Sequence, residues 1–468
     1  MMNYWSDARR GTSSASDSKD HRTPFEHDFD RLLFSTPVRR LSDKTQVWPL
    51  DRNDGVRTRL THSHEVSNIA KSIGKRLAKS GLDFGADTND VVLPLLGAIG
   101  LVHDLGNPPF GHQGETAIGR WFSKNDAWIF SFKCEDKGVA LSKSVDEKFH
   151  PEFMEFEGNA QTIRLVSALQ ASPGNFGLDL TAATISALMK YSGLCHQRKR
   201  KSDDGFNCSL KKYGYFLSET QLVAWVREKT GLTIGQRHPI TWIMEAADDI
   251  AYSVLDIEDG MKKGVFSPDD LLADFENELG TSYPTIVSNL KDRFAQTSKT
   301  ARSIHDKREI KSSYIRTYFM RQLIEDTVLQ YEGDNDEIFG HRRQLGLLDE
   351  NSLCSYLKNF AFTYVFQSRS VLAVEDEGAL YIDKLMDFFW IAISHRKDIK
   401  DLKSNRLSAT AAYGFSLISD NYLQCVCAMD ECIPMRYKEL RLLTDMIAGM
   451  TDGFARSLYR DLLRDGHI

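Results

Sequence analysis

The sequence has no long uninterrupted apolar run. Its most apolar stretch, VVLPLLGAIGLV at 91–102, contains Pro94 and Gly97 and is well short of the roughly 20 residues that span a bilayer. Residues 1–22 contain no apolar segment of a secretory signal and are rich in Ser and Asp. These absences predict a cytoplasmic protein with no membrane segment and with a flexible tail at 1–22.

Cysteine is scarce and scattered. The chain of 468 residues contains seven, an odd number that is typical of reduced thiols in the cytosol rather than of a disulfide framework. The seven are Cys134, Cys195, Cys208, Cys354, Cys425, Cys427 and Cys432. The last three lack the paired C-x-x-C spacing and the fourth ligand of a structural zinc site. We interpret them as ordinary buried thiols.

Neither sign of charge dominates the chain. It has 59 Lys and Arg against 65 Asp and Glu, a net charge of −6, which argues against coating nucleic acid by net charge alone. A local basic patch remains compatible with that balance. The stretch at 196–216 is rich in Lys and Arg with interleaved aromatics, and from its composition it is typical of a solvated surface excursion.

Only twelve prolines interrupt the chain, and most long segments have apolar residues spaced three and four apart. Examples lie at 65–81, 160–170, 241–264 and 381–397. The pattern predicts an all-α fold. An acidic stretch punctuated by proline near 265–300 indicates a boundary between two helical regions.

The densest group of polar residues is HDLGNPPFGHQGE at 103–115, directly after the apolar run. Imidazole and carboxylate, as in His103 and Asp104, suit Mn²⁺, Fe²⁺, Mg²⁺ or Zn²⁺. The same pair is also compatible with a helix C-terminus that Gly106 ends. This pair alone does not separate the two interpretations.

The second half of this stretch favours a catalytic site over a simple helix end. Pro108 and Pro109 force a rigid non-helical turn, because proline fixes φ and removes a hydrogen-bond donor. His112 and Glu115 follow three residues apart, as an acid/base histidine oriented by a carboxylate would.

Other polar residues have helical spacing. In 241–264, Asp248, Tyr252 and Asp256 recur every four residues and share one face, whereas Asp249 points about a quarter-turn away. Two further polar stretches are RTRLTHSHEV (57–66) and FEGNAQ (156–161). The arginine and histidine three apart in the first could address one ligand, although such a pair is more often structural.

The sequence resembles the H…HD…D pattern of HD-domain phosphohydrolases. The residues that match it are R59-x-x-H62, the adjacent His103 and Asp104, and the later Asp248. The resemblance extends to the bacterial deoxyguanosine triphosphate triphosphohydrolase (dGTPase) branch of that superfamily. It is carried, in family order, by RRLSDKTQVWPLDRNDGVRTRLTHSHEV (39–66), HDLGNPPFGHQGE (103–115), FEGNAQTIRLV (156–166), LMKYSG (188–193), KKYGYFLSE (211–219), TWIMEAADDIAYSVLDIED (241–259) and DMIAGMTDGFA (445–455).

The resemblance implies a helical HD core at 23–265 that holds the metal and the nucleotide, and a helical region at 266–468 that completes the pocket and the oligomer contacts. It assigns the metal ligands as His62, His103, Asp104 and Asp248, in preference to the neighbouring His64 and Asp249. It assigns His112 and Glu115 as the catalytic pair. The residues that it places against the triphosphate are Arg59, Asn159, Lys190, Tyr191 and Lys212, and those against the nucleoside are Gln46, Val47, Tyr252 and Asp256.

The implied reaction is hydrolysis of dGTP to deoxyguanosine and inorganic triphosphate by water attack at the α-phosphorus, with Mn²⁺ or Mg²⁺ as cofactor. The resemblance also implies a homo-oligomer, expected to be a hexamer, and activation by single-stranded DNA. Two alternatives are a dNTP triphosphohydrolase of broader specificity and a nucleotide-binding regulator without turnover. The base-reading residues fall in the loosely matched region at 265–440, where the candidates are Glu375, Glu377, Arg396 and Arg406.

Overall fold

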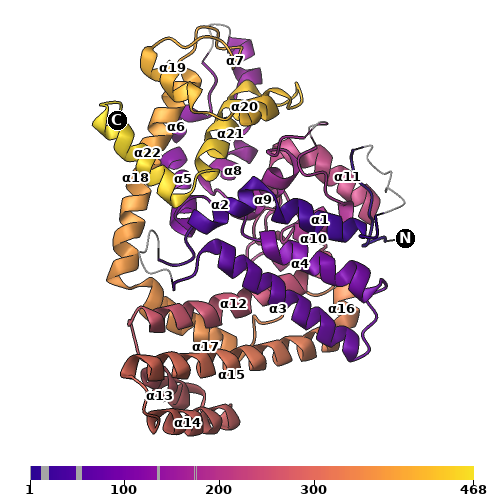
Figure 1. Cartoon of the computed structure of the whole chain (residues 1–468). Helices are drawn as coiled ribbons and strands as arrows, with labels where there is room; N and C mark the ends of the chain where they lie inside the picture. Colours follow the sequence, from indigo (N-terminus) through magenta and orange to yellow (C-terminus); the bar gives the residue numbers. More distant parts are fainter. Residues whose placement is uncertain (1, 12–19, 49–54, 134–136, 173, 175) are drawn as a thin grey trace.

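A computed structural model describes residues 2–11, 20–48, 55–133, 137–172, 174 and 176–468 (Figure 1). These residues form α-helices, short 3₁₀ and π turns and two isolated bridges, and no longer β-strand lies within them. The all-α prediction is therefore confirmed. The first helices are α1 (Pro24–Leu33), α2 (Thr36–Arg40), α3 (Arg59–Lys79), α4 (Leu93–Val102), α5 (Gly111–Lys124), α6 (Asp126–Ile129), α7 (Lys137–Lys143), α8 (Pro151–Met154), α9 (Gly158–Ser167), α10 (Ala182–Leu188), α11 (Thr220–Thr230) and α12 (Thr241–Lys262).

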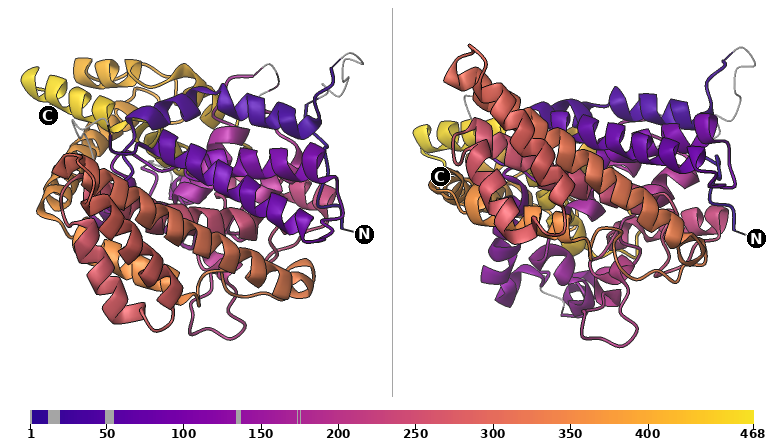
Figure 2. Two further views of the ribbon diagram at one scale, coloured as in Figure 1. Left: turned by 60° about the horizontal axis from the view of Figure 1, so that its bottom comes forward. Right: turned by 90° about the horizontal axis from the view of Figure 1, so that it is seen from below.

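The later part of the chain is helical as well. It contains α13 (Pro268–Leu279), α14 (Pro284–Ser298), α15 (Ile304–Gly333), α16 (Asn335–Phe339), α17 (Ser352–Ala361), α18 (Arg369–Ser394), α19 (Ala409–Ser416), α20 (Asp420–Cys427), α21 (Met435–Ala448) and α22 (Asp452–Arg464). Helices α15 and α17 pack on α12 (Figure 2). Helix α18 packs on α5, α21 and α22 (Figure 1). The buried apolar side chains form one cluster from Phe25 to Leu462, which crosses the boundary expected near 265–300.

Helix α4 is surrounded by other helices, which explains the most apolar stretch of the sequence. It contacts α1, α3, α10 and α12, so it needs apolar side chains on every side. Gly100 lets α3 approach closely, because a Cβ there would lie 2.7 Å from Ser67 Cα. The Ser67 hydroxyl also donates to Gly97 O at 2.9 Å. This close packing brings the start of α3 and the end of α4 together.

The expected flexible tail is corrected for residues 2–11, which pack on the body of the protein. The Trp5 ring meets His238 edge-on at 4.9 Å, and Arg9 pairs with the buried Asp28 at 2.6 Å. The Ala183 N–H donates to Ser6 O at 3.0 Å. Aromatic and arginine side chains find buried partners here, which a low apolar content did not reveal. Residues 12–19 of that tail lie outside the described residues.

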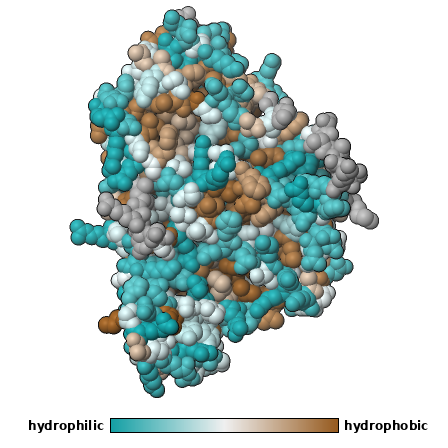
Figure 3. Space-filling view, in the orientation of Figure 1, coloured by the Kyte–Doolittle hydropathy of each residue, from teal (hydrophilic) through white to brown (hydrophobic). Residues whose placement is uncertain are grey.

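The described helices include none that is both long and apolar enough to cross a membrane. The face seen in Figure 1 is largely hydrophilic, with separate apolar patches (Figure 3). The cysteines within the described residues are free thiols, and Cys134 lies outside them. Cys427 and Cys432 are exposed rather than buried as expected, since they lie at the end of α20 and in the turn that follows it.

Candidate metal centre and active site

Three of the predicted metal ligands meet where α3, α4 and α12 come together. His62 lies in the first turn of α3, His103 directly follows α4, and Asp248 lies in α12. Asp248 Oδ1 is 3.4 Å from His62 Nε2 and 3.2 Å from His103 Nε2. Within the described part of the chain, this is the one group of three His, Cys, Asp or Glu residues close enough to hold a metal ion.

The chemistry of these donors fits a divalent cation. His103 Nδ1 donates to Gly100 O at 2.8 Å, so Nε2 is the ring nitrogen that can bind a cation once it has lost its proton. That Nε2 is buried and faces Asp248 Oδ1, as does Nε2 of the buried His62. A backbone carbonyl that orients a ligating imidazole is typical of metal sites. The cluster therefore suits a mixed nitrogen and oxygen metal site.

The charges around His103 act on its protonation. Burial lowers the pKa of His103, but the carboxylates of Asp248 and Asp104 outweigh burial and raise the pKa to about 9. Burial raises the pKa of Asp248, whereas the His103 charge holds that pKa well below its usual range. A cation that binds here must displace a proton, so its affinity is expected to rise with pH.

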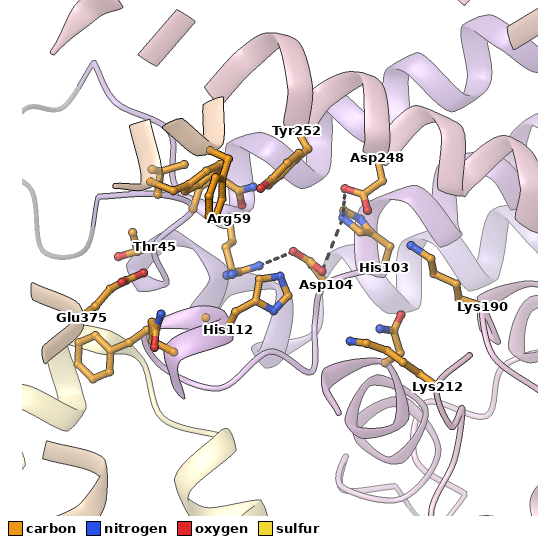
Figure 4. A pocket seen from close by; sticks show the side chains of 18 of the residues that line it. Thr45, Arg59, His103, Asp104, His112, Lys190, Lys212, Asp248, Tyr252 and Glu375 are labelled. Carbon is orange, nitrogen blue, oxygen red and sulfur yellow. Dashed lines mark hydrogen bonds and ion pairs between the residues drawn. The ribbon is translucent and has the colours of Figure 1, made fainter. Parts of the chain in front are cut away.

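Asp104, the fourth predicted ligand, is turned toward Arg59. One of its oxygens pairs with Arg59 Nη1, and the other lies 3.9 Å from His103 Nε2 (Figure 4). Arg59 begins α3, is 5% exposed, and takes this carboxylate as its partner. Asp104 thus lies beside the three-residue cluster and not within it, and its role as a ligand stays a prediction.

The two alternatives rejected on sequence grounds lie elsewhere. Asp249 Oδ1 pairs with Lys358 Nζ of α17 at 2.8 Å. His64 is exposed on the outer face of α3. The family resemblance therefore selected, in both cases, the side chain that faces the cluster, and for Asp248 the helical spacing agreed with it.

The predicted acid/base pair is held at the start of α5. His112 Nδ1 lies 2.9 Å from Glu115 Oε2, and Glu115 Oε1 accepts the Gly158 N–H at 2.8 Å. Glu115 is thereby fixed between α5 and the first residue of α9. The hydrogen bond to Glu115 and its charge raise the pKa of His112. The His112 side chain is exposed, so its ring is accessible to a ligand.

A cavity of about 400 Å³ adjoins this cluster (Figure 4). It is lined by every predicted site residue except His62, Glu115 and Asp256. His62 and Glu115 lie behind the wall, where they contact Asp248 and His112. Residues separated by about 200 positions in the sequence therefore share one cavity.

Cationic side chains gather on one side of the cluster. Lys190 and Lys212 lie beside His103 and Asp248 in Figure 4. Lys190 Nζ is 3.5 Å from Glu245, and Lys212 Nζ is 2.6 Å from Glu157. Burial lowers the pKa of each lysine, but these carboxylates outweigh it and raise both values. Both side chains are therefore charged and suit a polyanionic ligand.

Asp256 differs from its expected position. It was expected beside the sugar with Tyr252, but it is fully buried and does not line the cavity. Tyr252 does line it and stacks on Phe366 with the ring centroids 5.4 Å apart. Neither oxygen of Asp256 has a hydrogen-bond partner, and burial raises the pKa of this carboxyl well above its usual range. The helical period placed both residues on one face but could not give their depth.

The C-terminal half supplies cavity residues that the sequence did not reveal. They come from the π-turn at Phe362–Phe366 and the start of α18. These residues are Phe362, Phe366, Gln367 and Leu372, together with the already considered Glu375. The aromatic stretch FAFTYVF at 360–366 was the available signal, but a run of core residues has the same composition.

The four base-reading candidates differ in their position relative to the cavity. Glu375 lines the cavity, whereas Glu377 accepts a hydrogen bond from Tyr381 at 3.0 Å. Arg396 is buried and pairs with Glu439 at 2.6 Å. Arg406 stacks over Phe415. The last three do not line the cavity, so Glu375 is the one of these four candidates that lies in its wall.

Comparison with known proteins gives two findings. Residues 59–161 match the model of the HD domain family. The chain is 36% identical over 478 aligned positions to a "Deoxyguanosinetriphosphate triphosphohydrolase-like protein" of Listeria innocua, and the match covers 97% of each chain. A protein with the same printed name from Listeria monocytogenes is also 36% identical, again over 97% of each chain.

Proposed function

Because the chain belongs to the deoxyguanosinetriphosphate triphosphohydrolase-like family and is an HD-domain phosphohydrolase, we propose that it hydrolyses dGTP to deoxyguanosine and inorganic triphosphate. One observation carries the proposal. A single cavity adjoins the His62, His103 and Asp248 cluster, the His112 side chain and two charged lysines. A nucleoside triphosphate presents matching groups, namely a chain of anionic phosphates beside a 5′-oxygen that leaves with a proton.

The phosphate side of the substrate is assigned to Lys190, Lys212 and Arg59, whose charges would neutralise the phosphate oxygens as the bond breaks. A Mn²⁺ or Mg²⁺ ion bound by the cluster would supply Lewis-acid stabilisation and activation of water. His112 would donate a proton to the leaving 5′-oxygen, with Glu115 orienting its ring.

The nucleoside is assigned to the opposite part of the cavity. Gln46 lines the wall and its Oε1 is buried without a hydrogen-bond partner, which favours a ligand hydroxyl there. The Tyr252 ring would leave no room for a 2′-hydroxyl and so prefer a deoxyribose. Asp256 would act from behind Tyr252. A hexamer, activation by single-stranded DNA and a cytoplasmic location are further proposals that rest on the family resemblance.

Product analysis with each dNTP tests this function. The purified protein is incubated with Mn²⁺ or Mg²⁺ and one dNTP in water labelled with ¹⁸O, and the products are separated. We expect deoxyguanosine and a triphosphate that carries the label, since water attacks the α-phosphorus. Pyrophosphate or stepwise phosphate release would contradict the proposal. Equal rates on all dNTPs would favour the broader enzyme, and binding without turnover would favour the regulator.

Glu375→Gln is expected to reduce the preference for dGTP over dATP by about ten- to a hundredfold, the value of one hydrogen bond to a charged group. A carboxylate in the cavity wall can accept both N–H groups of the guanine edge, whereas an amide turns one acceptor into a donor. The measurement is the ratio of kcat/KM for the two nucleotides. Glu377→Gln is the matched control, because Glu377 contacts Tyr381 and does not line the cavity. An unchanged ratio in Glu375→Gln would remove it from base recognition.

A further inference from the structure

The stretch DMIAGMTDGFA at 445–455 carries part of the family resemblance, yet none of its residues lines the cavity. Asp452 in this stretch is the first residue of α22 and is 1% exposed. A buried carboxylate needs hydrogen-bond donors, and here the donors are main-chain N–H groups of two cavity segments. The contacts of Asp452 therefore connect the stretch at 445–455 to the active site, although no residue of the stretch lines the cavity.

The carboxylate of Asp452 joins the two segments directly. Oδ1 accepts the Phe110 N–H at 2.9 Å, and Oδ2 accepts the Thr45 N–H at 3.0 Å. Phe110 precedes α5 with φ at 63°, a left-handed conformation that is unfavourable for a residue with a side chain. His112 lies two residues after Phe110, and Gln46 lies one residue after Thr45.

Lys44 makes a second connection between the same regions. Its side chain is buried, and Nζ donates to Asn107 O at 2.6 Å and to Ala448 O at 2.9 Å. Its own carbonyl accepts the Arg59 N–H at 3.0 Å. The turn at 103–111, the start of α3 and the end of α21 are thus tied to one residue that does not itself line the cavity.

Helix α18 supports the same turn from a third direction. Gly378 allows the Phe110 ring to lie against α18, because a Cβ there would come within 2.5 Å of Phe110 Cγ. The ring of Phe110 also packs near Tyr381, with centroids 6.0 Å apart. The position of the His112 turn is therefore set by contacts with the C-terminal region and not by the turn alone.

We propose that Lys44 and Asp452 are positioning residues that hold the His112 turn and the Gln46 segment at a fixed separation, side by side in the cavity wall. Their side chains contact the two cavity segments through the main chain of Phe110, Thr45 and Asn107. A shift of about 1 Å in such a group can cost about a hundredfold in rate. The expected effect on turnover rests on the proposed function, whereas the positioning itself does not.

Asp452→Asn tests the proposal. The amide keeps the size of the side chain, but its nitrogen cannot accept a hydrogen bond, so one of the two N–H groups loses its partner. The control is Asp43→Asn. Asp43 accepts a hydrogen bond from Thr451, the residue before Asp452, and is exposed. It contacts the same helix end and neither of the two N–H groups.

Two measurements are made on the intact, metal-loaded protein. Hydrogen–deuterium exchange is expected to be faster in peptides covering 44–47 and 107–112 in Asp452→Asn than in the wild type or Asp43→Asn. With dGTP and Mn²⁺, kcat is expected to fall about ten- to a hundredfold, with a smaller change in KM because Lys190 and Lys212 are not tied to Asp452. Mn²⁺ content and melting temperature serve to exclude general unfolding.

Unchanged exchange in both peptides, or a kcat within about twofold of the wild type, would overturn the proposal. A wild-type protein inactive on every dNTP would refute the proposed function instead, and the exchange data would still decide whether Asp452 positions the two segments. Burial lowers the pKa of Lys44 and the Asp452 charge raises it, so loss of that charge is expected to destabilise the Lys44 ammonium. If Asp452→Asn fails to fold, the double variant with Lys44→Met removes both charges and permits the same comparison.

Discussion

Asp248→Ala is expected to abolish metal binding and turnover, while Asp249→Ala retains both. Asp248 Oδ1 faces both imidazoles, 3.4 Å from His62 Nε2 and 3.2 Å from His103 Nε2. Residues that only orient metal ligands typically contribute ten- to a hundredfold to affinity, so loss of a ligand is expected to cost more than about a hundredfold. Metal content after dialysis against Mn²⁺ and the rate of triphosphate release are the measurements.

Asp249→Ala is the matched control because it removes an adjacent carboxylate from the same helix. Its partner is Lys358 of α17, so its loss leaves the three-residue cluster intact. Asp248→Asn extends the test, since it keeps the shape of the side chain and removes only its charge. Equal loss of metal from the Asp248 and Asp249 variants would show that the cluster is not the metal site.

His112→Ala is expected to lower kcat by roughly 10²- to 10⁴-fold, the usual contribution of a general acid or base. Metal content and dGTP affinity should change little, because His112 contacts Glu115 and none of the three cluster residues. Turnover and equilibrium binding of dGTP, measured on the same preparation, separate the two effects. Undiminished turnover would remove His112 from the mechanism.

Glu115→Gln gives an independent readout of the same pair. Its hydrogen bond and its charge raise the pKa of His112, so the neutral amide is expected to lower that pKa. A proton donor is active below its pKa and loses activity as pH rises through it. The alkaline loss of activity should therefore begin at a lower pH in Glu115→Gln than in the wild type. A coincident pH–rate profile would contradict this role for Glu115.

Local patterns in the sequence were sufficient to predict the helices and the residues that share one helical face. The four-residue spacing of Asp248 and Tyr252 gave their shared face of α12, and the structure places both on the cavity wall. The adjacency of His103 to a buried apolar run gave its position at the end of α4. Such inferences succeed because a helical face depends only on residues a few positions apart.

These local patterns could not predict how deeply a side chain is buried or which distant residue it contacts. The spacing predicted that Tyr252 and Asp256 share one helical face, and the family resemblance placed both beside the sugar, but the packing over that turn of α12 buries Asp256 completely. Likewise, Asp104 was expected in the cluster, and Arg59 from another helix takes its carboxylate. Residues 2–11 pack on the body because of partners about 170 to 230 positions away, as with Ala183 and His238.

The sequence by itself determined the all-α class, the helical faces and the residue types of the metal and acid/base groups. The tertiary structure decided which of these groups share the cavity, that Glu375 is the base-reading candidate in its wall, and that Asp452 supports the His112 turn. The physical reason is the separation along the chain of the residues that determine each feature. Helical periodicity depends on residues a few positions apart, whereas the distance between two side chains of one cavity depends on how helices from distant parts of the chain pack on one another.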